Sequence, residues 1–129
     1  MRAMASSRSE SVKIPRVALG TFRSTGDQAA MAVRCALRQA NVRAFDTASI
    51  YRNEVELGRE IRDAIRDGLV SRSELFITSK ISPYEMGLGK APAAVEGILK
   101  RLDLEYLDLL LIHWPGWCHQ SSPACDGMP

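Results

Sequence analysis

The feature that most constrains the fold is a regular alternation of short apolar runs with segments of helical periodicity. The apolar runs cover residues 17–19, 44–45, 75–79 and 106–112. Between them, apolar residues recur every three or four positions, which is typical of amphipathic helices. Strands that alternate with helices predict parallel strands joined by right-handed crossovers. The sequence therefore predicts an α/β fold with four parallel strands and three helices.

The expected helices have recognisable boundaries. Thr25 and Gln28, and roughly Asn53 and Glu56, have the spacing of a capping box at a helix start. Gly68 marks the end of the second helix. The unbroken apolar run at residues 109–112 predicts a last strand that is buried on both faces, as in parallel sheets.

Polar residues follow three of the expected strands. Asp46 ends the second strand, Lys80 the third and His113 the fourth, at intervals of 34 and 33 residues. The motif FDTASIY adds Tyr51 shortly after Asp46. The carboxyl ends of parallel strands meet at one edge of the sheet, where ligands bind in such folds. We therefore expect these four side chains to form one site.

Each of these residues also has an ordinary structural explanation. Asp46 can cap a turn, Lys80 can be a solvated surface lysine, Tyr51 a half-buried aromatic and His113 a satisfied core histidine. The coincidence of three consecutive strand ends with a nearby tyrosine favours a catalytic site over these four separate explanations.

The chemistry of such a site is coherent. A lysine ammonium favours the ionised form of a neighbouring phenol, so Lys80 would help Tyr51 release its proton. Asp46 would hold Lys80 charged and in place. Tyr51 would act as a general acid toward a developing alkoxide, and His113 would donate a hydrogen bond to the same oxygen.

Length and charge exclude several classes of protein. The 129 residues suit one domain, and 17 basic against 15 acidic residues give a net charge of +2. This balance argues against a nucleic-acid or anionic-membrane partner. No apolar run is long enough to cross a bilayer. Residues 1–11 are expected to be a disordered leader, and the cytoplasm is favoured over organelle targeting by this Ser- and Arg-rich segment.

Two weaker signals carry no site. The GLGK stretch at residues 87–90 lacks the Walker pattern and is interpreted as a flexible loop. Cys118, His119 and Cys125 lack a second ligand pair at zinc spacing, so we expect no metal. Residues 117–129 are expected to be an irregular tail. Trp114 and Trp117 follow the last strand, where they line a pocket or pack under a loop.

The chain resembles the aldo-keto reductases. FDTASIYRNEVELGREI is similar to the family signature around its catalytic Asp and Tyr. LFITSK resembles the strand with the catalytic Lys, YLDLLLIHWP the strand with the catalytic His, and LGTF the first-strand segment. The resemblance covers about residues 12–116 and rests on several motifs in the same order.

The resemblance implies a (β/α)8 TIM barrel that uses NADPH, or less often NADH, to reduce aldehydes or ketones to alcohols. By the resemblance, Tyr51 is the proton donor, Lys80 and Asp46 support it, and His113 orients the substrate carbonyl. The substrate would contact Tyr51, His113 and Trp114. The residues expected near the cofactor are Gly20, Thr21, Phe22 and Asp46.

The chain is short for this fold. A barrel of this type takes about 250 residues. We therefore expect residues 12–116 to be the N-terminal half of a barrel, and the chain to end early, before the family's residues for the adenosine phosphate. Two functions remain open: a reductase with a small-molecule carbonyl substrate, or a non-catalytic half-barrel that associates through its open edges or has no function.

Overall fold

The strands of this protein pair as the alternation predicts. The computed structural model describes residues 13–114, and the expected leader and tail lie outside the described residues. Four strands form one parallel sheet in the order β1-β2-β3-β4. Their bounds are β1 (Leu19–Gly20), β2 (Ala44–Asp46), β3 (Phe76–Ile81) and β4 (Leu109–Ile112).

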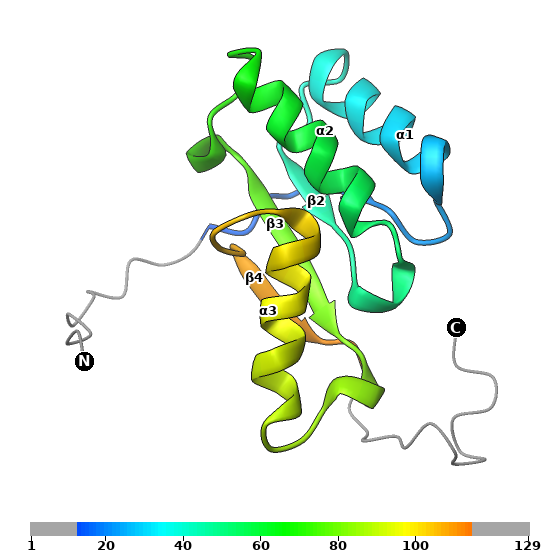
Figure 1. The fold of residues 1–129 in the computed structure, drawn as a ribbon. Helices are drawn as coiled ribbons and strands as arrows, with labels where there is room; N and C mark the ends of the chain where they lie inside the picture. Colours follow the sequence, from blue (N-terminus) through cyan, green and yellow to red (C-terminus); the bar gives the residue numbers. More distant parts are fainter. Residues whose placement is uncertain (1–12, 115–129) are drawn as a thin grey trace, which may run out of the picture.

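Three helices cover one face of this sheet (Figure 1). They are α1 (Gly26–Arg38), α2 (Glu54–Arg66) and α3 (Lys90–Leu102). Short 3-10 helices interrupt the loops: η1 (Ser49–Tyr51), η2 (Arg72–Glu74) and η3 (Pro83–Glu85). The predicted partial barrel of four parallel strands and three helices is confirmed. None of the helices in residues 13–114 is both long and apolar enough to span a membrane.

Strand alternation separates a packing face from a polar face. Phe45 pairs with Ile77 in register, and both are fully buried in the core. Asp46, directly after Phe45, and Lys80, three residues after Ile77, point to the opposite face because successive side chains in a strand alternate. The apolar core between sheet and helices consists of Val33, Ala36, Leu37, Phe45, Leu57, Ile61, Ala64, Val70, Leu75, Ile77, Ile98 and Leu102.

The prediction that the last strand is buried on both faces is wrong for the described residues. Leu110 and Leu111 are each 39% exposed, and Ile112 is 59% exposed. The reason is the position of β4 at the edge of the sheet, where no further strand or helix within residues 13–114 covers it. The apolar composition of β4 is suited to a buried strand, but residues 13–114 alone do not bury it.

The two predicted capping boxes are also wrong. Thr25 and Asn53 occupy the N-cap positions of α1 and α2, but neither side chain caps its helix. Capping boxes form instead at Ser71 with Glu74 and at Ser82 with Glu85. Asn53 is used elsewhere because its side chain is buried among other loops.

Close packing of α2 on α3 depends on Gly58, which generates a prediction. A Cβ atom at Gly58 would lie 2.1 Å from the carbonyl oxygen of Leu102. Since backbone cannot rotate away, Gly58→Ala is expected to lower the free energy of unfolding by about 1–3 kcal/mol. Urea denaturation followed by circular dichroism measures this change.

The matched control is Gly97→Ala in α3. The added Cβ would meet only the flexible guanidinium of Arg101, at 3.1 Å. This substitution is expected to change the free energy of unfolding by less than about 1 kcal/mol, and to favour the helix. Equal effects of the two substitutions would contradict the packing account.

Candidate active site

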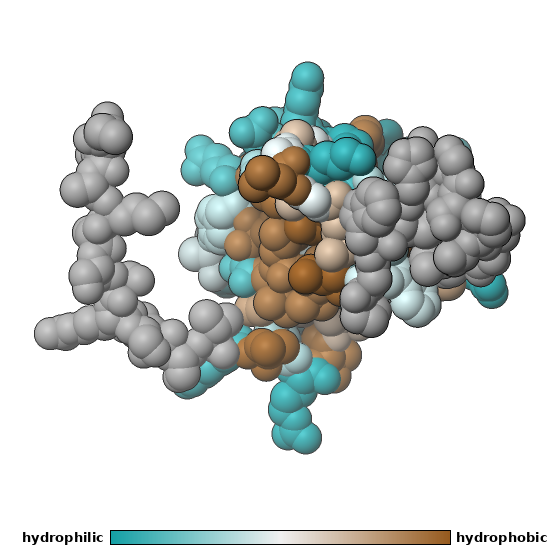
Figure 2. Space-filling view, turned by 90° about the horizontal axis from the view of Figure 1, so that it is seen from below, coloured by the Kyte–Doolittle hydropathy of each residue, from teal (hydrophilic) through white to brown (hydrophobic). Residues whose placement is uncertain are grey.

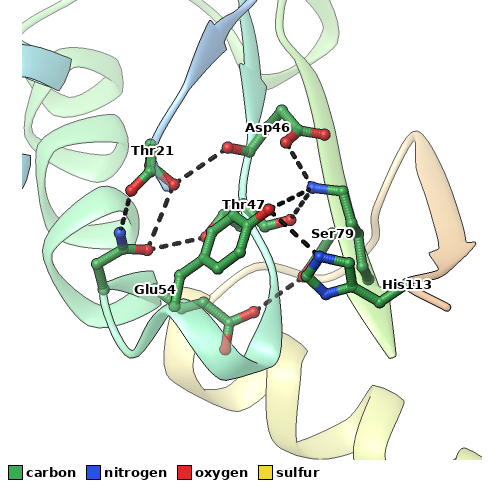
Figure 3. Close-up of polar contacts among 9 residues, drawn as sticks. Thr21, Asp46, Thr47, Glu54, Ser79 and His113 are labelled. Carbon is green, nitrogen blue, oxygen red and sulfur yellow. Dashed lines mark hydrogen bonds and ion pairs between the residues drawn. The ribbon is translucent and has the colours of Figure 1, made fainter. Parts of the chain in front are cut away.

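Four side chains predicted from the sequence meet at the carboxyl edge of the sheet (Figure 3). Asp46 ends β2, Tyr51 ends η1, Lys80 lies near the end of β3 and His113 follows β4. Lys80 pairs with Leu111 in register, so His113, two residues further, returns to the same face as Lys80. The parallel register therefore explains why residues so distant in sequence become neighbours.

The ammonium group of Lys80 lies at the centre of these contacts. Its Nζ is 2.5 Å from Oδ1 of Asp46 and 3.0 Å from the carbonyl oxygen of Thr47. It also donates to the Tyr51 hydroxyl oxygen, at 3.3 Å. The Lys80 side chain is 13% exposed. An ammonium has three N–H donors, and all three have an acceptor here.

Tyr51 and His113 form the second contact of the site. The Tyr51 hydroxyl lies 3.4 Å from Nε2 of His113, and the two rings meet edge to face with centroids 5.4 Å apart. Burial, together with the nearby charge of Lys80, lowers the pKa of His113, while Asp46 opposes this effect. His113 is thus neutral near pH 7. Its Nδ1 is buried and has no hydrogen-bond partner within residues 13–114.

Two further aromatic side chains border the site. The Phe22 ring lies 5.1 Å from the Tyr51 ring, and Trp114 stacks on His113 at 5.9 Å between centroids. Phe22 is 46% exposed and Trp114 is 38% exposed. An apolar rim of this kind is open to a ligand. The structure therefore places both residues beside the four central ones.

Gly20 and Thr21 differ in what they offer a ligand. Gly20 pairs with Asp46, and a Cβ atom on Gly20 would meet no heavy atom within 4 Å. Thr21 is 2% exposed, and its hydroxyl lies near the Asp46 carbonyl oxygen and the Asn53 side chain. Gly20 leaves open space over the sheet, while the Thr21 hydroxyl is already engaged within the protein.

The buried amide of Asn53 joins the loops around the site, a role that its sequence position did not predict. Its Nδ2 donates to the carbonyl oxygens of Thr21 and Ser24, each at 2.7 Å. Its Oδ1 accepts from the Thr47 hydroxyl at 2.9 Å. An Asn just before a helix is typical of an N-cap, so nothing in the sequence indicated these hydrogen bonds between loops.

Glu54 fixes the start of α2 from the other face of the sheet. It is 1% exposed, accepts a hydrogen bond from Ser79 at 3.0 Å and pairs with Arg101 at 2.6 Å. Burial raises the pKa of Glu54, although the bonds from Arg101 and Ser79 oppose the rise. Since Ser79 precedes Lys80, the same strand segment is anchored on both of its faces.

Glu85 joins the two loops that follow β2 and β3. Its carboxylate accepts hydrogen bonds from the Ser49 hydroxyl and from the backbone and hydroxyl of Ser82. Burial opposes ionisation, but these bonds together lower the pKa of Glu85. The contact to Ser49 holds the 3-10 helix that carries Tyr51.

The site offers protons and hydrogen bonds rather than metal ligands. No group of three metal-binding side chains occurs in the part of the chain that the structure describes. Cys118, His119 and Cys125 lie outside it. The arrangement places a phenolic O–H, a paired ammonium and an imidazole next to one another, which is suited to proton transfer to a polar ligand.

The surroundings of His113 generate a prediction for its titration in solution. The chain has two histidines, so His119→Gln leaves a single imidazole signal in an NMR titration. We expect His113 to titrate below its ordinary value of 6.5. Because the folded state disfavours protonation, stability is complete above that value and is lost as the pH falls from it toward the folded-state pKa. Titration at or above the ordinary value would contradict the burial and charge described here.

Comparison with known proteins places this chain in a family. A model of the aldo/keto reductase family matches residues 16–128. Glyoxal reductase from Bacillus subtilis is 43% identical over 106 residues, which are 81% of this chain and 37% of that protein. An uncharacterized oxidoreductase, C8E4.04, from Schizosaccharomyces pombe is 45% identical over 103 residues, which are 80% of this chain and 30% of that protein.

Solved structures of aldo-keto reductases also match this chain. The crystal structure of the aldo-keto reductase AKR2E4 from Bombyx mori in complex with NADP has a TM-score of 0.73 and 41% identity, over 79% of this chain and 35% of that chain. The chain spans roughly a third of the length of these relatives. The resemblance seen in the sequence motifs is confirmed, and the chain belongs to the aldo/keto reductase family.

Proposed function

We propose that this chain carries the proton-donating site of a reductase that converts aldehydes or ketones to alcohols with NADPH. The observation that supports this most is the Lys80 ammonium, which contacts both the Asp46 carboxylate and the Tyr51 hydroxyl. A phenol in contact with a cation is suited to donate its proton and bear the resulting charge. NADH is the less favoured cofactor.

The residues at the ends of β1 and β2 fit a flat nicotinamide ring. The side chain that Gly20 lacks would project on the same face as Asp46, into open space. Gly20, Phe22 and Asp46 would border the ring. Thr21 would contribute by holding the loop, because its hydroxyl is bonded within the protein.

The proposed chemistry uses Tyr51 as general acid. When bound, the cofactor supplies a hydride to the carbonyl carbon. The Tyr51 O–H donates its proton to the carbonyl oxygen, and the Lys80 ammonium stabilises the phenolate that remains. Asp46 compensates the charge of Lys80 throughout. Tyr51 then regains a proton from solvent.

His113 and Trp114 would orient the substrate. A neutral imidazole with its proton on Nε2 can donate a hydrogen bond to the carbonyl oxygen without competing as an acid. This tautomer matches the position of Nε2 beside the Tyr51 hydroxyl. Trp114, stacked on His113, would form a wall of the substrate pocket.

A second candidate function is association through the uncovered sheet. The β4 residues Leu110, Leu111 and Ile112 are exposed. Figure 2 shows apolar side chains gathered in the middle of the face seen from below Figure 1. Exposed apolar surface and an unpaired strand edge favour self-association. The cytoplasm remains the proposed location, on the sequence grounds given above.

The role of Tyr51 is testable in a chimera in which residues 13–114 replace the matching segment of the Bacillus subtilis glyoxal reductase. Tyr51→Phe removes the acidic proton but keeps the ring. We expect carbonyl reduction to fall by about 10²–10⁴-fold, the usual contribution of general acid catalysis. NADPH binding, followed by fluorescence, should stay nearly unchanged.

Tyr84→Phe in the same chimera is the matched control, since Tyr84 lies in η3 and forms no hydrogen bond with Lys80 or His113 within residues 13–114. It should keep the parent's turnover. A Tyr51→Phe chimera that keeps most of its turnover would remove Tyr51 from the mechanism.

The 129-residue chain taken alone is expected not to reduce carbonyls at a useful rate. No strand of residues 13–114 pairs with the outer edge of β4, and the chain spans roughly a third of the length of its relatives. Losing remote contacts to a bound molecule costs both affinity and orientation. Gel filtration, NADPH fluorescence titration and an absorbance assay check this. A monomer that binds NADPH and turns over a simple aldehyde would contradict this expectation.

A further inference from the structure

The side chain of Asn53 connects two segments of the candidate site that are far apart in the sequence. It is fully buried. A carboxamide has two N–H donors and an oxygen that accepts two bonds. The donors go to the carbonyl oxygens of Thr21 and Ser24, and the oxygen lies 2.9 Å from the Thr47 hydroxyl and 3.4 Å from that of Thr21. The amide is therefore fully satisfied.

The first part is the turn that carries Phe22. Thr21 and Ser24, whose carbonyl oxygens accept the two hydrogen bonds from the Asn53 amide nitrogen, flank Phe22 and Arg23. Arg23 has a φ of 61°, in the left-handed region that a non-glycine residue adopts only when its surroundings hold it there. The Phe22 ring lies against Tyr51. Anchoring both ends of the turn thus fixes the ring beside the phenol.

The second part is the backbone that holds Lys80. The Thr47 hydroxyl donates to Asn53, while the Thr47 carbonyl oxygen accepts from the Lys80 ammonium at 3.0 Å. Thr47 is itself fully buried, so its hydroxyl has no water to replace Asn53. Loss of this bond would free the peptide that supplies one of three acceptors to Lys80.

We propose that Asn53 is a positioning residue, which through one buried amide sets both the Phe22 turn and the Thr47 carbonyl that holds Lys80 beside Tyr51. The catalytic part of this proposal rests on the reductase function proposed above, whereas the structural coupling rests on the contacts of the chain itself. Asn53 does not touch a reacting atom and acts through Thr47 and Phe22.

The first experiment needs no activity. In the 129-residue chain with His119→Gln, the NMR titration of His113 is compared between the parent, Asn53→Ala and Thr47→Val. Releasing Lys80 weakens its charge at His113 and admits water, and both changes raise the pKa of His113. We expect this pKa to rise in both variants, and Thr47→Ser, which restores the hydroxyl, to return it toward the parent value.

Glu60→Gln separates positioning from general loss of stability. Glu60, within α2, is also a buried polar residue, 3% exposed, but it pairs with Arg34 and Arg59 away from the site. Glu60→Gln should lower the free energy of unfolding without changing the pKa of His113. A shift as large as that of Asn53→Ala would overturn the proposal.

An unchanged His113 titration in folded Asn53→Ala and Thr47→Val would also overturn it. If Asn53→Ala does not fold, the pair Thr47→Val and Thr47→Ser decides alone. In the chimera, Asn53→Ala should lower kcat/KM by about 10- to 10²-fold through misplacement of the acid. A chimera that is inactive even with Asn53 intact, while the titration shifts as expected, would support the positioning and count against the reductase function.

Discussion

The ammonium group of Lys80 is where the separate loops of this sheet edge meet. Its three donors are matched by a carboxylate, a backbone carbonyl and a phenol, from Asp46, Thr47 and Tyr51. A charge that is only 13% exposed needs such compensation, because an unpaired buried charge is costly. Tyr51 lies on a 3-10 helix rather than on a strand, so its position depends on this contact, on the bond from Ser49 to Glu85 and on the Phe22 turn.

The parallel sheet makes the contact possible by separating packing from chemistry. Phe45 and Ile77 point into the core, while Asp46 and Lys80, an odd number of positions further along the same strands, point to the other face. On the core face of β3, Ser79 donates a hydrogen bond to Glu54, which in turn pairs with Arg101. The same alternation that buries the core therefore also fixes the polar group, and a shift of one residue in register would exchange the two faces.

The fold and the four central residues were predictable because strand alternation and residue spacing are local signals. Asp46, Lys80 and His113 each follow an apolar run, and parallel pairing brings such ends together. Asn53 was not predictable, because its partners Thr21 and Thr47 become neighbours only after the sheet has formed. The burial of β4 was mispredicted for a related reason: composition describes the burial that a strand is suited to, whereas Ile112 has no covering element within residues 13–114.

NMR of the lysine ammonium groups shows whether Lys80 joins Asp46 and Tyr51 in one polar cluster. A buried, fully bonded ammonium exchanges its protons slowly enough to give a distinct nitrogen–proton signal, which Lys80→Met would remove and thereby assign. We expect this signal to exist in the 129-residue chain and to move in both Asp46→Asn and Tyr51→Phe. Absence of a protected Lys80 signal, or a signal that neither substitution moves, would contradict it.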